Sequence, residues 1–154
     1  MISPTRLNLL TLYRFGVGFL GLWALILVSS MPVLMQEAGP LLLFLALSVS
    51  VKRAGFRVAP RVTHSLVGLV DVAALMVFGM AGGAWVAGLS APLHLIGRAV
   101  RHRLRTREEW LDLPVFNFGL RVIMAVVGSW VYQSLGGEFG ARAMPLTQFI
   151  ALLV

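Results

Sequence analysis

The residues that could do chemistry are four polar side chains set inside long apolar runs. Asp71 and His94 interrupt one apolar stretch, and Asn117 and Arg121 interrupt the next. A carboxylate, an imidazole, an amide and a guanidinium can pair with one another, relay a proton or hold a small ligand. Ionisable groups at bilayer depth are costly and normally face the interior of a helix bundle. We therefore expect these four residues to form one intramembrane polar cluster.

The spacing of Asp71 and His94 predicts that the two side chains lie at one depth. Two helices, over about 63–80 and 83–101, are expected to meet at a glycine-rich turn over 80–83. Asp71 lies eleven residues before this turn, and His94 lies eleven to twelve residues after it. At about 1.5 Å per residue, both lie about 16–18 Å from the turn, near the centre of a core about 30 Å thick.

Two interpretations of the cluster stay open at this point. Asp71 and Arg121 each lie about eight residues into their helices from the cytoplasmic side, a depth of about 12 Å. In the structural interpretation they form an ion pair that holds three helices in register, with His94 and Asn117 hydrogen-bonding nearby. In the functional interpretation the same residues line a polar pocket that binds a small ligand or relays a proton. These residues could also face a partner subunit.

Composition places the chain in a membrane. Its 154 residues are 58% hydrophobic and 12% charged, with a mean hydropathy of +0.88. Soluble domains carry about 25% charged residues. The net charge of +7 could indicate nucleic-acid binding, but the arginines cluster between apolar runs, as in cytoplasmic loops of membrane proteins. The absence of cysteine excludes disulfides, thiolate metal sites and cysteine nucleophiles.

We predict an all-α fold, a polytopic transmembrane bundle of about five to six helices in a single domain over 1–154. The expected helices are 9–30, 39–51, 63–80, 83–101, 113–135 and a run from 145 that we expect to continue beyond Val154. Basic residues concentrate before the first run and in the loops over 52–61 and 98–107, whereas the alternate loops hold only Arg142. This asymmetry predicts a cytoplasmic N-terminus.

The basic loop residues are expected to contact anionic lipid head groups on the cytoplasmic side, each contributing about 1 kcal/mol. The predicted lipid contacts are Lys52, Arg53, Arg57, Arg61, Arg98, Arg101 and Arg105. Other membrane subunits or a second copy of the chain are the expected protein partners, and no nucleic acid is expected.

Other chemistry finds little support in the sequence. Gly16, Gly18 and Gly21 match the letters of a dinucleotide-binding fingerprint, but they lie inside an apolar helix, where small residues let a neighbouring helix approach. No metal-ligand spacing such as H-E-x-x-H occurs, and no catalytic residue is predicted. We predict no cofactor; haem or pigment ligation by His64, His94 or His102 is the alternative.

One family resemblance follows from the placed helices. The chain contains the hairpin VDVAALMVFGMAGGAWVAGLSA, an arginine-rich loop, the sequence FNFG at 116–119 and VYQSLGG at 131–137. Over about 39–137 this pattern resembles the N-terminal membrane domain of bacterial cyclic-di-GMP signalling proteins, in which a helix bundle precedes an HD-GYP or GGDEF domain. Asp71 falls where that family is usually apolar or hydroxylated. No HD or GGDEF motif occurs here, so no catalytic residue is carried over.

Three functional hypotheses follow. The resemblance implies a sensor or anchor that crosses the bacterial inner membrane several times and transmits to a cytoplasmic output domain beyond Val154. The alternative is an accessory transmembrane subunit of a larger energy-converting or photosynthetic complex. The third is a small-molecule carrier with Asp71, His94 and Arg121 along its path, although internal repeats and broken helices typical of carriers are not evident.

Overall fold

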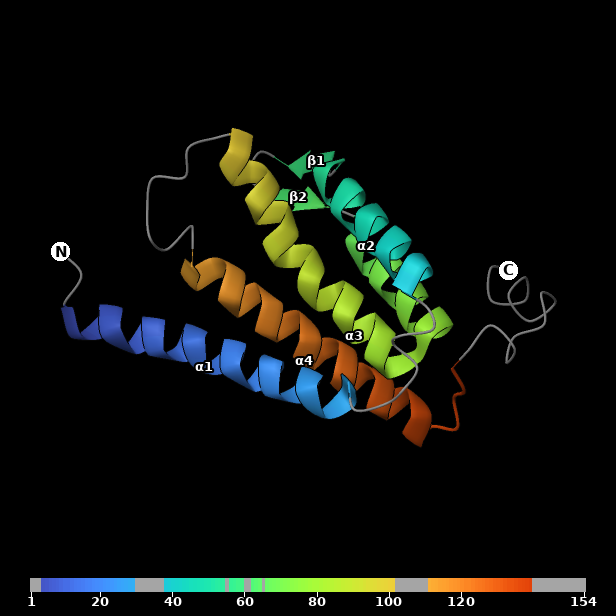
Figure 1. The fold of residues 1–154 in the computed structure, drawn as a ribbon. Helices are drawn as coiled ribbons and strands as arrows, with labels where there is room; N and C mark the ends of the chain where they lie inside the picture. Colours follow the sequence, from blue (N-terminus) through green and yellow to red (C-terminus); the bar gives the residue numbers. More distant parts are fainter. Residues whose placement is uncertain are drawn as a thin grey trace.

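The computed structural model describes residues 4–29, 38–54, 56–59, 62–64, 66–101 and 111–139. Its elements, in order, are α1 (Pro4–Ser29), α2 (Ala38–Arg53), β1 (Phe56–Ala59), β2 (Val62–His64), α3 (Val67–Arg101) and α4 (Leu113–Ser134) (Figure 1). By length and composition, three stretches could cross a membrane: Leu9–Ser29, Val67–Gly97 and Leu113–Ser134, the second counted across the break in α3 at Gly79. The all-helical class is thus confirmed, apart from a short strand pair, and the three apolar stretches fit a membrane protein.

The number and bounds of the helices differ in part from the prediction. Within the described residues there are four helices rather than five to six, and the run from 145 lies outside those residues. The two helices expected over 63–80 and 83–101 are parts of α3, and residues 62–64, expected as loop and helix start, form β2. β2 pairs antiparallel with β1, in a register that sets Phe56 opposite His64 and contains a bulge.

α3 reverses direction at Gly79. Its backbone angles there are φ 70° and ψ −169°, a region that is essentially restricted to glycine. A Cβ added to Gly83 would lie 2.8 Å from Cα of Leu75, although eight residues of continuous helix would separate two residues by about 12 Å. The two limbs of α3, 67–78 and 80–101, therefore fold back on each other as a helical hairpin (Figure 1). The predicted hairpin exists, with its turn at Gly79 rather than at 80–83.

α1 and α4 cross with their backbones in direct contact. Gly119 of α4 faces Val17 and Gly18 of α1, and a Cβ added to Gly119 would lie 2.6 Å from Cα of Gly18. A Cβ added to Gly21 would in turn collide with the backbone of Gly119. Gly18 and Gly21 thus act as small packing residues, as predicted, whereas a Cβ added to Gly16 would meet nothing within 4 Å; the two helices lie side by side in Figure 1.

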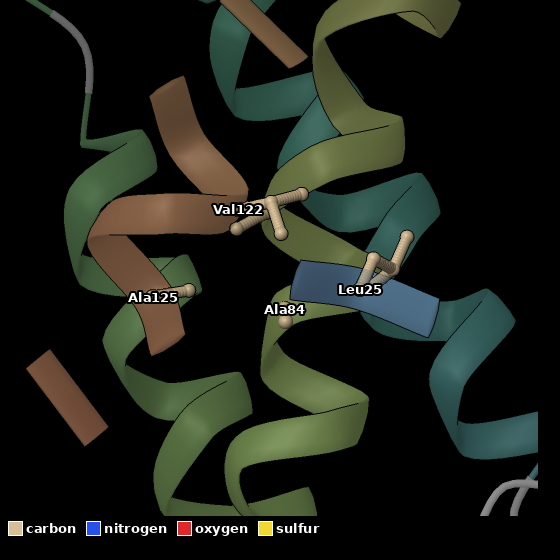
Figure 2. Close-up of a cluster of buried hydrophobic side chains, with 5 residues drawn as sticks. Leu25, Ala84, Val122 and Ala125 are labelled. Atoms are coloured by element: carbon tan, nitrogen blue, oxygen red, sulfur yellow. The ribbon is translucent and has the colours of Figure 1, made fainter. Parts of the chain in front are cut away.

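The centre of the bundle lies where the second limb of α3 meets α1 and α4. Leu25 of α1, Ala84 of α3, and Val122 and Ala125 of α4 form one buried cluster (Figure 2). Because Ala84 is small and fully buried, the limb can approach both neighbours closely. α4 packs on both α1 and α3, and α1 also contacts α3 directly, where Nε1 of Trp85 donates to the hydroxyl of Ser29 at 2.8 Å.

α2 packs on both limbs of α3. Phe44 of α2 meets Phe78 of the first limb edge to face, with ring centroids 5.1 Å apart. Leu41, one turn earlier, lies against Gly82 of the second limb. α2 thereby covers the hairpin on the side away from α1 and brings its own C-terminal residues to the level of Asp71.

Candidate functional site

The centre of the site is an ion pair between α3 and α4. Nη1 of Arg121 donates to Oδ2 of Asp71 at 2.6 Å. The other carboxylate oxygen of Asp71 accepts a hydrogen bond from the hydroxyl of Ser48, on α2, at 3.3 Å. Three helices thus meet at one carboxylate, and the predicted Asp71–Arg121 pair is present.

Lys52 and Ser90 extend this polar region on its other side. Nζ of Lys52, in the last turn of α2, donates to Oγ of Ser90 at 2.8 Å, and that hydroxyl donates to the carbonyl of Ala87 at 2.8 Å. Burial lowers the pKa of the Lys52 ammonium from 10.5 to about 8; the positive charge of Arg121 adds to this effect and that of Asp71 opposes it. Ser90 is fully buried, so its hydroxyl serves the packing of α2 on α3.

A pocket of about 410 Å³ opens beside the ion pair, between α3 and α4. Asp71, Asn117 and Arg121 are its polar lining residues. Apolar or small residues from both limbs of α3 and from α4 complete it: Gly68, Val72, Leu75, Ala87, Leu120, Met124 and Ala125. Its volume lies within the range of about 300–1,000 Å³ typical of small-molecule sites. Three of the four predicted cluster residues therefore line one pocket.

His94 is the fourth predicted residue, and it does not line this pocket. The displaced turn gives the reason. With the reversal at Gly79, the residue eight positions after it, Ala87, lies level with Asp71, eight positions before it. His94 lies seven residues further along, about 10 Å away at 1.5 Å per residue. The prediction that Asp71 and His94 share one depth is therefore wrong.

The basic residues predicted to meet lipid fall into two groups. Lys52 is half-buried and its ammonium group donates to Ser90 inside the bundle, so its contact with lipid stays a prediction. Arg53 is exposed, beside Gly97 of α3. The backbones of Arg57, Arg98 and Arg101 are described, in β1 and the last turn of α3, but their side chains are not; Arg61 and Arg105 lie outside the described residues.

A second ion pair joins α1 to the start of α4. Nη1 of Arg14 lies 3.6 Å from Oδ2 of Asp112, and both side chains are largely buried. Asp112 directly precedes α4 without capping it through its side chain, so this carboxylate is used for the contact with α1.

The haem or pigment alternative falls mostly outside the described side chains, since only His94 of the three histidines has a described side chain. The side chain of His64 is not described, and His102 lies outside the described residues. Across the described part of the chain, no group of three His, Cys, Asp or Glu residues could hold a metal ion.

Sequence reasoning missed Ser48, Lys52 and Ser90. Ser48 and Lys52 are four residues apart, and this spacing predicts that both lie on one face of a helix and could belong to one polar site. Lys52 is also the only lysine in the sequence. We assigned it to a loop because the apolar run ends at Val51, whereas α2 continues to Arg53.

Comparison with known proteins does not assign the chain to a family. No family model, curated protein sequence or solved structure matches the chain.

Proposed function

We propose that the chain is the membrane sensor domain of a bacterial signalling protein, spanning the inner membrane several times with its N-terminus in the cytoplasm. The observation that carries the proposal is the ion-paired pocket between α3 and α4. Ionisable residues inside a membrane domain mark functional sites, and here they line a cavity of ligand size. The sequence resemblance to cyclic-di-GMP signalling proteins supports the same assignment.

The packing offers a path from the pocket to the end of the described chain. A ligand that contacts Arg121 would act on Asp71, to which α2, α3 and α4 are all connected. Beyond α4, Phe139 lies next to the reversal of α3, with its Cβ 3.7 Å from the Cβ position of Gly79. A shift between the limbs of α3 would therefore displace the segment that follows α4, and so any output domain attached there.

The first test is the mass of the natural protein, extracted from its membrane with its partners in mild detergent and measured by native mass spectrometry. A chain tens of kilodaltons heavier than 16.7 kDa supports the proposal. A chain of 16.7 kDa that travels with other membrane subunits contradicts it and favours the accessory-subunit alternative. The outward faces of α1 and α4, where Phe19, Trp23 and Trp130 are exposed, could meet either lipid or such subunits.

A second test measures output directly. Cells that carry the natural gene with Met124→Trp, which fills the pocket, are compared with cells that carry Val127→Trp on the same helix. Both side chains are exposed, but Met124 lines the pocket and Val127 does not. We expect cellular cyclic-di-GMP to change in the first strain and to stay at the wild-type level in the second. Equal levels in all three strains would contradict a sensing role for the pocket.

A further inference from the structure

We propose that the pocket between α3 and α4 binds a membrane-soluble amphiphile with a single carboxylate head, the chemistry of a long-chain fatty acid. The head would lie on Arg121 and Asn117, and the tail along Leu75 and Met124. That this ligand is the sensed signal rests on the proposed function, but its binding can be measured independently.

The sign of the charge selects an anion. Among the described residues, three ionisable groups interact at the site, Asp71, Arg121 and Lys52, and with all three ionised they sum to +1. An anionic head brings this sum to zero, whereas a cation raises it to +2. Charges interact more strongly away from water, so this difference weighs more here than on a surface.

The hydrogen-bonding capacity of Arg121 selects a carboxylate. A guanidinium carries five N–H donors in a planar fork that matches two carboxylate oxygens. Among the described residues, Arg121 donates only to Asp71, through Nη1. Its side chain is 31% exposed, against 15% for that of Asp71, so the arginine is the partner that a ligand can reach. Asn117, one turn earlier on the same helix, supplies an amide donor at the same pocket.

The order of residues along the pocket matches an amphiphile. Gly68 and Asn117 lie one turn before Asp71 and Arg121, nearer the first residues of α3 and α4. Leu75 and Met124 lie one turn after the ion pair, towards the middle of the bundle. The polar groups therefore occupy the end nearer the membrane surface, and the apolar groups the deeper end.

The pocket opens where lipid would lie. Val72 and Met124 line it and are 53% and 65% exposed on the apolar outer face of the bundle. A ligand that enters between them comes from the bilayer rather than from water. Apolar tails are soluble in that phase, which favours a lipid-like carboxylate over a water-soluble one.

The test measures equilibrium binding of labelled palmitate to the purified full chain in nanodiscs of zwitterionic lipid. We expect saturable binding of one palmitate per chain. Unlabelled palmitate should compete, whereas hexadecanol, which has the same tail without the charge, should compete at least tenfold more weakly. Equal competition by hexadecanol would overturn the role of the anion. Equal competition by phosphatidylglycerol would overturn the carboxylate and assign the site to lipid phosphate.

Matched variants locate the site. Met124→Trp should weaken palmitate binding at least tenfold, and Val127→Trp, one turn along the same exposed face, should bind like the wild type. Wild-type affinity in Met124→Trp, or equal loss in both variants, would exclude this pocket. Arg121→Lys keeps the charge next to Asp71 but removes the planar fork, so we expect weaker binding in a chain with wild-type helix content. If palmitate binds as expected but cyclic-di-GMP does not respond to Met124→Trp in cells, the ligand assignment stands and the sensing role fails.

Discussion

The crossing of α1 and α4 offers the sharpest test of the fold. In Gly119→Ala, the new Cβ meets the carbonyl oxygen of Val17 and lies 2.6 Å from Cα of Gly18. Both obstacles are backbone atoms, so no side-chain rotation can relieve the clash. Since ordinary contacts of a Cβ begin near 3.4 Å, the two helices must separate by close to 1 Å. Overpacking of this kind costs about 1–3 kcal/mol, and we expect the upper end because only movement of a whole helix relieves it.

The matched control is Gly128→Ala, on the same helix. A Cβ at Gly128 meets nothing within 4 Å, so only helix propensity changes, which favours alanine by about 0.8–1.0 kcal/mol. Gly119→Ala gains the same helix propensity, so the two variants should differ by the overpacking cost alone, about 2–3 kcal/mol in the free energy of unfolding. Unfolding in mixed micelles of dodecyl maltoside and SDS, followed by far-UV circular dichroism, measures this difference. If Gly119→Ala is as stable as Gly128→Ala, the glycine crossing of α1 and α4 is not present.

Three further predictions address the hairpin and the polar region. Gly79→Ala should destabilise the protein by about 1–3 kcal/mol, because alanine cannot easily adopt φ 70° and ψ −169°; a neutral result would contradict the reversal there. In a double-mutant cycle, Asp71→Asn and Arg121→Gln should together cost less than the sum of the single changes, with a coupling of about 0.5–3 kcal/mol, and strict additivity would show that the residues do not touch. The pKa of Lys52 is about 8 in the folded protein, against a reference value of 10.5 for the unfolded chain. Between these two pH values the unfolded chain binds more protons than the folded protein, so the free energy of unfolding should rise as pH increases from about 8 to 10.5. This rise, measured by thermal unfolding across that pH range, should disappear in Lys52→Met, and its persistence would assign it to other groups.

Those features of the fold that depend on composition and length could be predicted from the sequence. The apolar run at 113–135 predicted α4 within one residue at its C-terminal end, because a membrane-length run bounded by a proline and a glycine leaves few alternatives. The ion pair was predictable as well. Two opposite charges at equal depth in neighbouring helices have no better partner than each other.

The position of the turn in α3 could not be predicted at the accuracy that the site requires. Gly79, Gly82 and Gly83 can each adopt a positive φ, and nothing in the local sequence selects among them. Only packing decides, since Gly82 and Gly83 are needed as small residues against Phe78 and Leu75. An error of about three residues in the turn moves the residue opposite Asp71 by about six to seven positions. That shift alone explains why His94 was wrongly assigned.

The pocket follows from the position of this turn. Reversal at Gly79 sets Ala87 opposite Asp71, so a methyl group stands where a larger side chain would fill the space beside the ion pair. Had the chain turned at residue 82, His94 would lie near Asp71, and its imidazole would fill the space beside that carboxylate. The small residues that let the limbs of α3 pack closely therefore also leave Arg121 partly accessible. In this fold, close packing at the turn and an open site at the ion pair have one structural cause.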